Sequence, residues 1–123
     1  MILVDTSVWV DHLRTTDGQL QALLQDGRVL AHPFVIGELA LGSLKNRDVV
    51  LESLQDLPET LVATDEEVMR FIGQQTLYGL GIGYIAAHLL VAVRLTPDAR
   101  LWTRDKRLLA ATTKLGLAAS MTH

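Results

Sequence analysis

The stretch MILVDTSVW, residues 1–9, decides the fold. Its apolar run, residues 2–4, is short and stops at Asp5, which is typical of a buried strand. Asp5 and the two hydroxyl residues after it supply N-cap side chains for a helix that runs on through Leu13. We therefore expect a strand whose carboxyl end leads directly into a helix, with an acidic side chain at the junction.

The rest of the sequence repeats this alternation of short apolar runs and helical segments. Thr64 and Glu67 have the spacing of a capping box, and Gly116 is placed to end the last helix. Strands that alternate with helices predict one α/β domain, residues 1–123, with a parallel sheet covered on both faces. We expect further strands at 29–31, 60–63, 100–103 and 117–120, and helices at 19–25, 34–44, 48–57, 65–77, 84–95 and 106–115.

The composition excludes several classes of protein. The 123 residues are 49% hydrophobic, with a mean hydropathy of +0.25, so the chain can build a packed core. The absence of cysteine excludes disulfides, thiolate metal sites and cysteine nucleophiles. No apolar stretch approaches the roughly 20 residues of a membrane helix, and no signal peptide is visible. We therefore expect a soluble intracellular protein that buries some apolar surface against a partner.

Charge is unevenly distributed along the chain. Residues 1–93 hold 5 Lys+Arg and 12 Asp+Glu, whereas residues 94–123 hold 6 Lys+Arg and 2 Asp+Glu, within a net charge of -3. A basic last quarter on an acidic body could steer a polyanion to one place. The same pattern also fits a solvated helix face.

Three acidic residues stand where chemistry could gather. Asp5 and Asp105 follow predicted strands, and the carboxyl ends of parallel strands are where open α/β sheets bind ligands. Each of the two could instead be a helix N-cap. Glu38 lies in the apolar segment 34–41, so we expect its carboxylate to face burial, unless it sits at the rim of the helix. Together the three could bind Mg²⁺ or Mn²⁺, with hydroxyls of Thr6 and Thr103 nearby.

Other sequence patterns give weaker indications of function. The glycines of 79–83 do not form the dinucleotide-binding pattern and do not follow a strand. The four histidines have no paired ligand spacing, and His88, on an apolar helix, is interpreted as structural. A phosphotransfer domain that uses Asp5 would want a second acid at position 7, which is serine.

At this point the chain resembles the PIN-domain ribonucleases, and among them the VapC-type toxins of bacterial toxin–antitoxin pairs. The likeness covers essentially the whole chain. It rests on four segments in order, each modest alone: residues 1–9, 36–39 (Ile-Gly-Glu-Leu), 81–85 (Gly-Ile-Gly-Tyr-Ile) and 101–108 (Leu-Trp-Thr-Arg-Asp-Lys-Arg-Leu).

The resemblance implies a three-layer α/β/α sandwich around a parallel sheet of four to five strands. It implies cleavage of structured RNA (tRNA or rRNA) by water activated on Mg²⁺ or Mn²⁺, in the bacterial cytoplasm. Asp5, Glu38 and Asp105 match three of the family's acidic positions. Asp5, position 86 and Asp105 would hold the metal, Glu38 would hold or orient the water, and Thr6 and Thr103 would assist. RNA would approach over cationic side chains, Arg14, Arg100, Arg104, Lys106 and Arg107.

The resemblance also implies partners. A cognate VapB-type antitoxin would hold the toxin in check, the toxin would form homodimers and toxin–antitoxin hetero-oligomers, and operator DNA would be bound only through the antitoxin. Apolar residues of the second and fourth helices are candidate contact surfaces, although they could equally be core. They are Leu23, Leu24, Val50, Leu51 and Leu54.

The chain departs from the family at one acidic position. Where the family pattern reads Gly-Tyr-Ile-Asp-Ala-His, this sequence has Ala86. Alanine supplies no charge and no oxygen ligand, so we expect weaker metal binding and strongly impaired cleavage. We interpret Ala86 as an inactivating replacement made because the active toxin would poison its host, with a natural degenerate homologue as the alternative. Two other functions stay open: a catalytically silent antitoxin-binding module, and a PIN nuclease of RNA processing.

Overall fold

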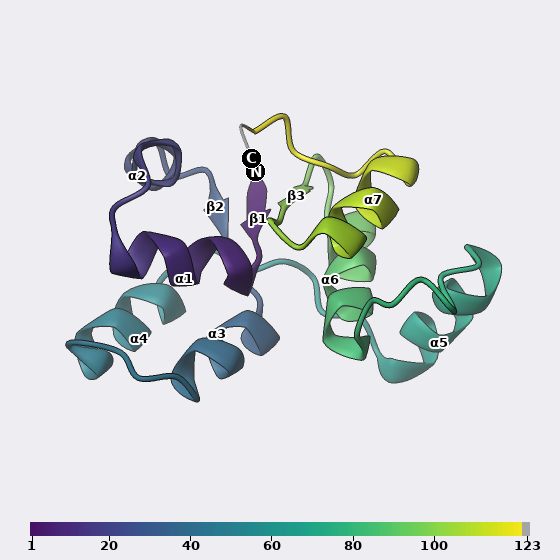
Figure 1. Ribbon diagram of the computed structural model, residues 1–123, viewed down its shortest axis with the longest axis horizontal. Helices are drawn as coiled ribbons and strands as arrows, with labels where there is room; N and C mark the ends of the chain where they lie inside the picture. The colour runs from purple at the N-terminus through teal and green to yellow at the C-terminus, as the bar shows by residue number, and fades with distance from the viewer. Residues whose placement is uncertain (122–123) are drawn as a thin grey trace.

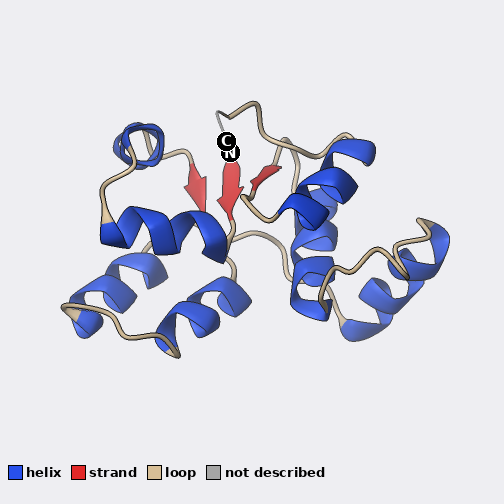
Figure 2. Cartoon of the chain, in the orientation of Figure 1, coloured by secondary structure: helices blue, strands red, loops and turns tan. Residues whose placement is uncertain are grey.

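A parallel three-stranded sheet forms the centre of the molecule. The computed structural model describes residues 1–121, so the last two positions of the predicted domain lie outside the described residues. Strands β1 (Ile2–Val4), β2 (Val29–Leu30) and β3 (Arg100–Trp102) lie in the order β2-β1-β3, and both pairings are parallel. Figure 2 shows the three strands side by side with helices around them. The predicted α/β fold with a parallel sheet is confirmed, but the sheet has three strands within residues 1–121 and not the four to five that we expected.

Each edge of the sheet is extended by a single bridge rather than by a strand. Ala31 pairs with Glu59, and Leu101 pairs with Ala118, both in parallel orientation. The predicted strand 60–63 is reduced to the bridge at Glu59: the Thr60 N–H donates to the Ala31 carbonyl (3.1 Å), and the Leu61 N–H donates to the Thr96 hydroxyl (3.0 Å). The predicted strand 117–120 also shortens to its bridge, since the chain turns at its end.

Seven helices cover the sheet among the described residues. Figure 1 shows α1–α4 gathered on the side of β2 and α5–α7 on the side of β3. Their bounds are α1 (Thr6–Arg14), α2 (Gly18–Gln25), α3 (Pro33–Ala40), α4 (Arg47–Gln55), α5 (Asp65–Gln74), α6 (Tyr84–Leu95) and α7 (Lys106–Lys114).

Local signals explain most of the helix ends. The capping box at α5 forms as predicted: the Glu67 N–H donates to the Thr64 hydroxyl (3.1 Å), and the Thr64 N–H donates to the Glu67 carboxylate (3.0 Å). Gly116 has φ +71° directly after the end of α7, as predicted. Helix α3 ends at Ala40, four residues earlier than predicted, because Leu41 is 90% exposed and no longer packs on the core.

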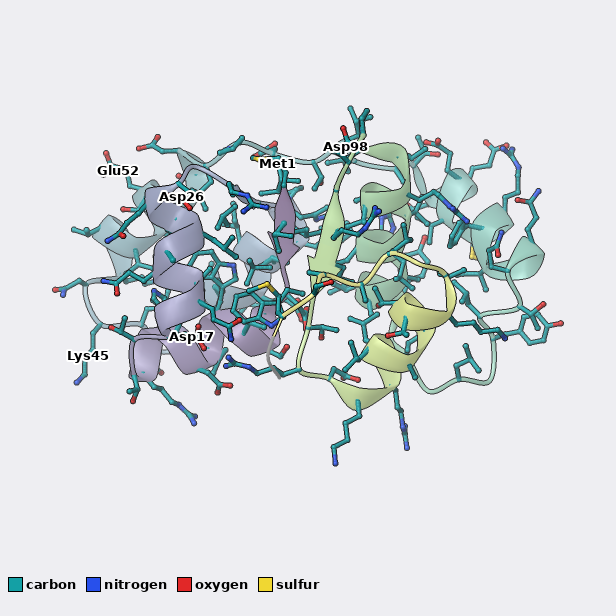
Figure 3. All side chains as sticks on the ribbon, turned by 90° about the horizontal axis from the view of Figure 1, so that it is seen from above. Met1, Asp17, Asp26, Lys45, Glu52 and Asp98 are labelled. Carbon is teal, nitrogen blue, oxygen red and sulfur yellow. The ribbon has the colours of Figure 1, made fainter. Side chains whose placement is uncertain are left out.

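The core consists of aliphatic side chains with two indoles, those of Trp9 and Trp102. β1 and β3 contribute fully buried residues from the middle of the sheet, and α6 packs the other half of the core against β3. The largest of these side chains are Leu3, Leu89, Leu90, Leu101 and Trp102. At the amino ends of the strands, the Met1 amino group donates to the Asp98 carbonyl (3.5 Å), and Figure 3 shows these two residues at one end of the sheet. No helix in residues 1–121 is long and apolar enough to cross a membrane.

Candidate active site

The carboxyl ends of β1 and β3 bring two acidic residues together where the strands finish. We call this end of the sheet its carboxyl edge. Asp5 follows β1, and Asp105 follows β3 after two further residues. The strands are neighbours, and the Asp5 N–H donates to the Trp102 carbonyl (2.9 Å), so the ladder continues to the junction. Figure 1 shows α1, α3 and the beginning of α6 below this edge. Open parallel sheets bind ligands at this edge.

Asp5 is not used as a helix cap. It is 9% exposed, and its side chain makes no capping hydrogen bond to α1. Instead its Oδ2 accepts from the Ser7 hydroxyl (2.7 Å) and from the Thr103 hydroxyl (2.8 Å). Two charge-assisted bonds therefore fix the orientation of this carboxylate, and no described residue donates to its Oδ1.

Thr103 connects the two acidic residues. It is fully buried, and its hydroxyl donates to Asp5 while it accepts from the Asp105 N–H (3.1 Å). Asp105 itself caps α7, since its Oδ1 accepts from the N–H groups of Arg107 and Leu108 (3.0 Å each). The alternative interpretation of Asp105 as an N-cap therefore holds. It leaves Oδ2 and the exposed side of the carboxylate open to a ligand.

Glu38 joins the same edge from α3, but not in the way we expected. The expectation that its carboxylate is buried is wrong: Glu38 is exposed, because α3 packs on the core through Val35 and Leu39. Its Oε1 accepts from the Thr6 hydroxyl (2.8 Å). Thr6 follows Asp5 in the chain, so this bond attaches α3 to the junction of β1 and α1.

Ala86 lies in the first turn of α6 on the side that faces the sheet. It is half-buried and packs against the same core as Leu89, Leu90 and Val93, which follow it at helical spacing. The loop before α6 also touches α7, because a Cβ on Gly81 (φ +75°) would lie 2.6 Å from Nη1 of Arg107. The helix that begins with Asp105 is thus in contact with the segment that leads to Ala86.

The residues present do not complete a metal site. No group of three or more His, Cys, Asp or Glu side chains within residues 1–121 is close enough to hold a metal ion. Asp5, Glu38 and Asp105 are connected through the hydroxyls of Thr6 and Thr103 rather than gathered around one point. Ala86 has a methyl side chain and supplies no oxygen donor.

The predicted RNA-binding cations occupy different places. Lys106 and Arg107 lie in the first turn of α7, beside Asp105. Arg100 is the first residue of β3 and lies at the amino ends of the strands, away from Asp105. The Arg104 guanidinium donates to Asp11 (2.7 Å) and to Asp17 (2.6 Å).

These two ion pairs give Arg104 a structural role. The hydrogen bonds to Asp11 and Asp17 raise the pKa of its guanidinium above the usual value, and its central carbon lies 5.6 Å from the centroid of the Trp102 ring. The sequence offered no signal for the two pairs, because the partners are 93 and 87 residues away. Arg14, the remaining cation, ends α1.

A second polar cluster, which the sequence did not predict, joins α3, α5 and α6. His88 is buried, as the structural interpretation implied, and its Nε2 lies 2.9 Å from Asp65 Oδ1. The Tyr84 hydroxyl donates to the same oxygen (2.7 Å), which lowers the pKa of Asp65. The Phe34 ring contacts His88 with 4.8 Å between ring centroids. The cluster holds the first turns of α3 and α6 together.

We predict that Thr103→Val destabilises the protein by about 1–3 kcal/mol, because Asp5 loses a buried hydroxyl donor and the Asp105 N–H loses its acceptor. This corresponds to a fall in Tm of about 4–12 °C, measurable by differential scanning calorimetry. Thr112→Val is the matched control: Thr112 is equally buried, but its hydroxyl donates only to the Leu108 carbonyl of its own helix. Equal losses in the two variants would refute a special role for Thr103.

The fold and this acidic edge define an α/β protein of the PIN-like class. Ribonuclease VapC32, from two strains of Mycobacterium tuberculosis (CDC 1551 / Oshkosh and ATCC 25618 / H37Rv), is 54% identical over 118 residues, which are 96% of this chain and 95% of that protein. No family model matches the chain, and no solved structure matches it. At this identity over nearly the whole length, the chain belongs to the VapC family of ribonuclease toxins.

Proposed function

We propose that the chain is a ribonuclease toxin of a type II toxin–antitoxin module that acts on structured RNA (tRNA or rRNA) in the bacterial cytoplasm. One observation supports this best: the Asp5 carboxylate is held by Ser7 and Thr103 beside Asp105, at the carboxyl edge of the sheet. If Asp5 only capped α1 or formed a buried ion pair, it would not need two hydroxyl donors that hold it beside Asp105. Membership of the VapC family favours the toxin over a nuclease of RNA processing.

We further propose that cleavage needs Mg²⁺ or Mn²⁺, and that Ala86 leaves this chain impaired. Bound with Asp5, Asp105 and a carboxylate introduced by Ala86→Asp, such an ion would supply a Lewis acid and an activated water. Glu38, held by Thr6, is placed to orient that water, and Ser7 and Thr103 keep Asp5 in position. The test is digestion of total RNA by the Ala86→Asp variant with Mn²⁺, compared with the unaltered chain.

The substrate would reach this edge over α7. Lys106 and Arg107 are exposed in the first turn of that helix, next to Asp105, and suit contacts to phosphate. Arg14 ends α1, the helix that begins directly after Asp5. Arg104 is paired with two carboxylates, and Arg100 lies at the amino ends of the strands. We therefore propose that these two residues attract RNA through the electrostatic field of the protein and do not contact the phosphate that is cleaved.

The antitoxin would occupy an apolar groove between α1, α2 and α4. Of the five candidate contact residues, Leu23 and Leu54 are core, whereas Leu24, Val50 and Leu51 are partly buried. Leu24, Val50 and Leu54 line the groove, which has a volume of about 230 Å³ and also includes Trp9 and the 66%-exposed Val49. A helix of the antitoxin with apolar residues at i, i+3 and i+4 fits such a groove.

Homodimers, hetero-oligomers with the antitoxin and binding of operator DNA through the antitoxin complete the proposal. With Ala86, antitoxin binding is also the second candidate function of this chain. If this second function is right, the chain forms a complex with the antitoxin but does not cleave RNA. The alternative in which Asp5 accepts a phosphoryl group would want an acid at position 7, but that residue is Ser7, whose hydroxyl donates to Asp5.

We expect Val49→Asp to weaken antitoxin binding at least about tenfold, because the charge would be desolvated in an apolar contact. Val49 is 66% exposed, so stability should change little. Isothermal titration calorimetry with the purified antitoxin measures the effect. Met69→Asp on α5 is the control, since Met69 is 61% exposed and does not line the groove. The same loss in both variants, or none in Val49→Asp, would place the antitoxin elsewhere.

A further inference from the structure

A second and larger groove begins at Glu38 and runs between α1 and the connection from α3 to α4. Its volume is about 530 Å³, which is in the range of small-ligand pockets. Thr6 and Glu38, which share a hydrogen bond, form its end at the candidate active site. Arg14 and Lys45 line it as well. The groove is therefore continuous with the acidic edge of the sheet.

The chemistry of the groove has two parts. Its walls include apolar side chains from both helices, among them Val10 and Leu13 (37% exposed each) and Leu39. Its cations, Arg14 and Lys45, form no ion pair with a residue of the described chain. Apolar walls with unpaired cations suit a ligand that combines a flat base with a phosphate.

The charge is unexpected for this part of the molecule. Residues 1–93 contain 5 Lys+Arg against 12 Asp+Glu, yet two of those five cations meet at this groove. Arg14 also suits the last turn of α1 through the helix dipole, but that role does not account for Lys45, which belongs to no helix. Figure 3 shows Lys45 on the outer side of the molecule.

The dimensions also suit a polynucleotide. Thr6 and Arg14 are the two ends of α1, which rises about 12 Å between them. Figure 1 shows α1 and α3 beginning near the carboxyl end of β1, and the two helices are in contact. A strand cleaved beside Asp5 and Glu38 could therefore continue along the groove for at least one nucleotide.

We propose that this groove is a subsite for the single-stranded nucleotide next to the scissile phosphate, with its base on Val10 and Leu13 and its phosphate on Arg14 and Lys45. The proposal rests on the proposed ribonuclease function and adds a specificity element to it. An unstacked base can enter such a groove, whereas a base held in a duplex cannot. The groove would therefore accept an unpaired nucleotide and reject a paired one at this position.

Binding of a fluorescent single-stranded RNA oligonucleotide to the unaltered chain, followed by anisotropy, tests the subsite without cleavage. Arg14→Ala/Lys45→Ala should lower the dependence of log affinity on log salt by about 1.4, or about 0.7 for each phosphate that is no longer neutralised. Lys114→Ala is the matched control, because Lys114 ends α7 as Arg14 ends α1. Its salt dependence should stay within error of the parent chain, and an equal fall in both would overturn the subsite.

A second pair of variants tests the groove itself. Ser43 lines it and is exposed, so Ser43→Glu places a negative charge between the cations, whereas Ser43→Gln keeps the same size without charge. We expect Ser43→Glu to bind the single strand about tenfold more weakly than Ser43→Gln, which adds the same volume without the charge. Binding of the duplex with the same sequence should respond much less. Equal losses for single strand and duplex would overturn the subsite in favour of a diffuse electrostatic surface.

The outcomes also separate the subsite from the function. If Ala86→Asp cleaves RNA with Mn²⁺ while Ala86→Asp/Ser43→Glu cleaves the same positions at the same rate, the subsite is wrong and the ribonuclease function stands. If the groove variants weaken antitoxin binding and leave RNA binding intact, the groove belongs to the antitoxin and the proposal fails. Loss of cleavage in loops, with the control variants unaffected, supports it.

Discussion

The Ala86→Asp variant is expected to cleave RNA at least about 100-fold faster than the unaltered chain when Mn²⁺ or Mg²⁺ is present. Position 86 lies in the first turn of α6 on the side facing the sheet, and the first turn of a helix accepts an acidic side chain. The new carboxylate would join Asp5 and Asp105 at the carboxyl edge. Gel analysis of total RNA, with and without EDTA, measures the gain.

The control variant is Ala86→Asn, which has the shape of Asp without its charge and should gain little. Ala86→Asp/Asp5→Asn should lose the gain again, because it removes the carboxylate that Ser7 and Thr103 hold in place. If Ala86→Asp folds and still shows no metal-dependent cleavage, the ribonuclease mechanism proposed for this edge is wrong.

Thermal stability gives the same variant a readout that does not depend on activity. A third carboxylate near two others adds like-charge repulsion, so in EDTA the unaltered chain should melt at a higher temperature than Ala86→Asp. Mn²⁺ should raise the Tm of the variant, because a ligand that binds only the folded state stabilises it, and should raise that of the unaltered chain less. Equal Tm values in EDTA, with no response to Mn²⁺, would contradict a shared metal site.

The sequence predicts the elements that depend on local signals. The junction at Asp5, the capping box at Thr64 and the end of α7 at Gly116 each follow from a few adjacent residues, and each is present. The parallel sheet follows from the alternation of strands and helices. The apolar residues of 60–63 predict a strand, but only a bridge at Glu59 forms, and Leu61 bonds instead to the distant Thr96 side chain.

The parts of the site that the sequence does not predict depend on long-range partners. The apolar character of α3 predicts a buried Glu38, yet its exposure depends on which face of the helix meets the core. The residues next to Arg104 in the chain do not reveal its ion pairs, because the folded chain brings Asp11 and Asp17 to it from a distance. Such pairings follow from tertiary packing, which periodicity alone does not specify.

Acidification below neutral pH is expected to destabilise the protein through His32, which precedes α3. His32 is fully buried, and its Nδ1 accepts from the Phe34 N–H (3.0 Å), so the ring caps the helix in its neutral form. Burial, and to a smaller extent the nearby His88, lower the pKa of His32 to about 4. Protonation would replace the acceptor by a donor that faces another donor, and α3 carries Glu38.

The direction of the effect follows from proton uptake. The unfolded chain binds a proton at His32 near the ordinary pKa of about 6.5, whereas the folded chain binds it only near pH 4. Between these values the unfolded state holds more protons, so the stability present above pH 6.5 declines as the pH falls. Over the whole interval the loss approaches about 3 kcal/mol.

Urea unfolding at pH 7.5 and pH 5 measures this loss as a lower midpoint at acid pH. His32→Asn is the informative variant, because Asn can accept the same capping hydrogen bond but does not titrate. Its stability should therefore change less between the two pH values than that of the unaltered chain. A variant that loses as much stability as the parent between pH 7.5 and pH 5 would assign the acid sensitivity to other groups, and the cap at α3 would have no part in it.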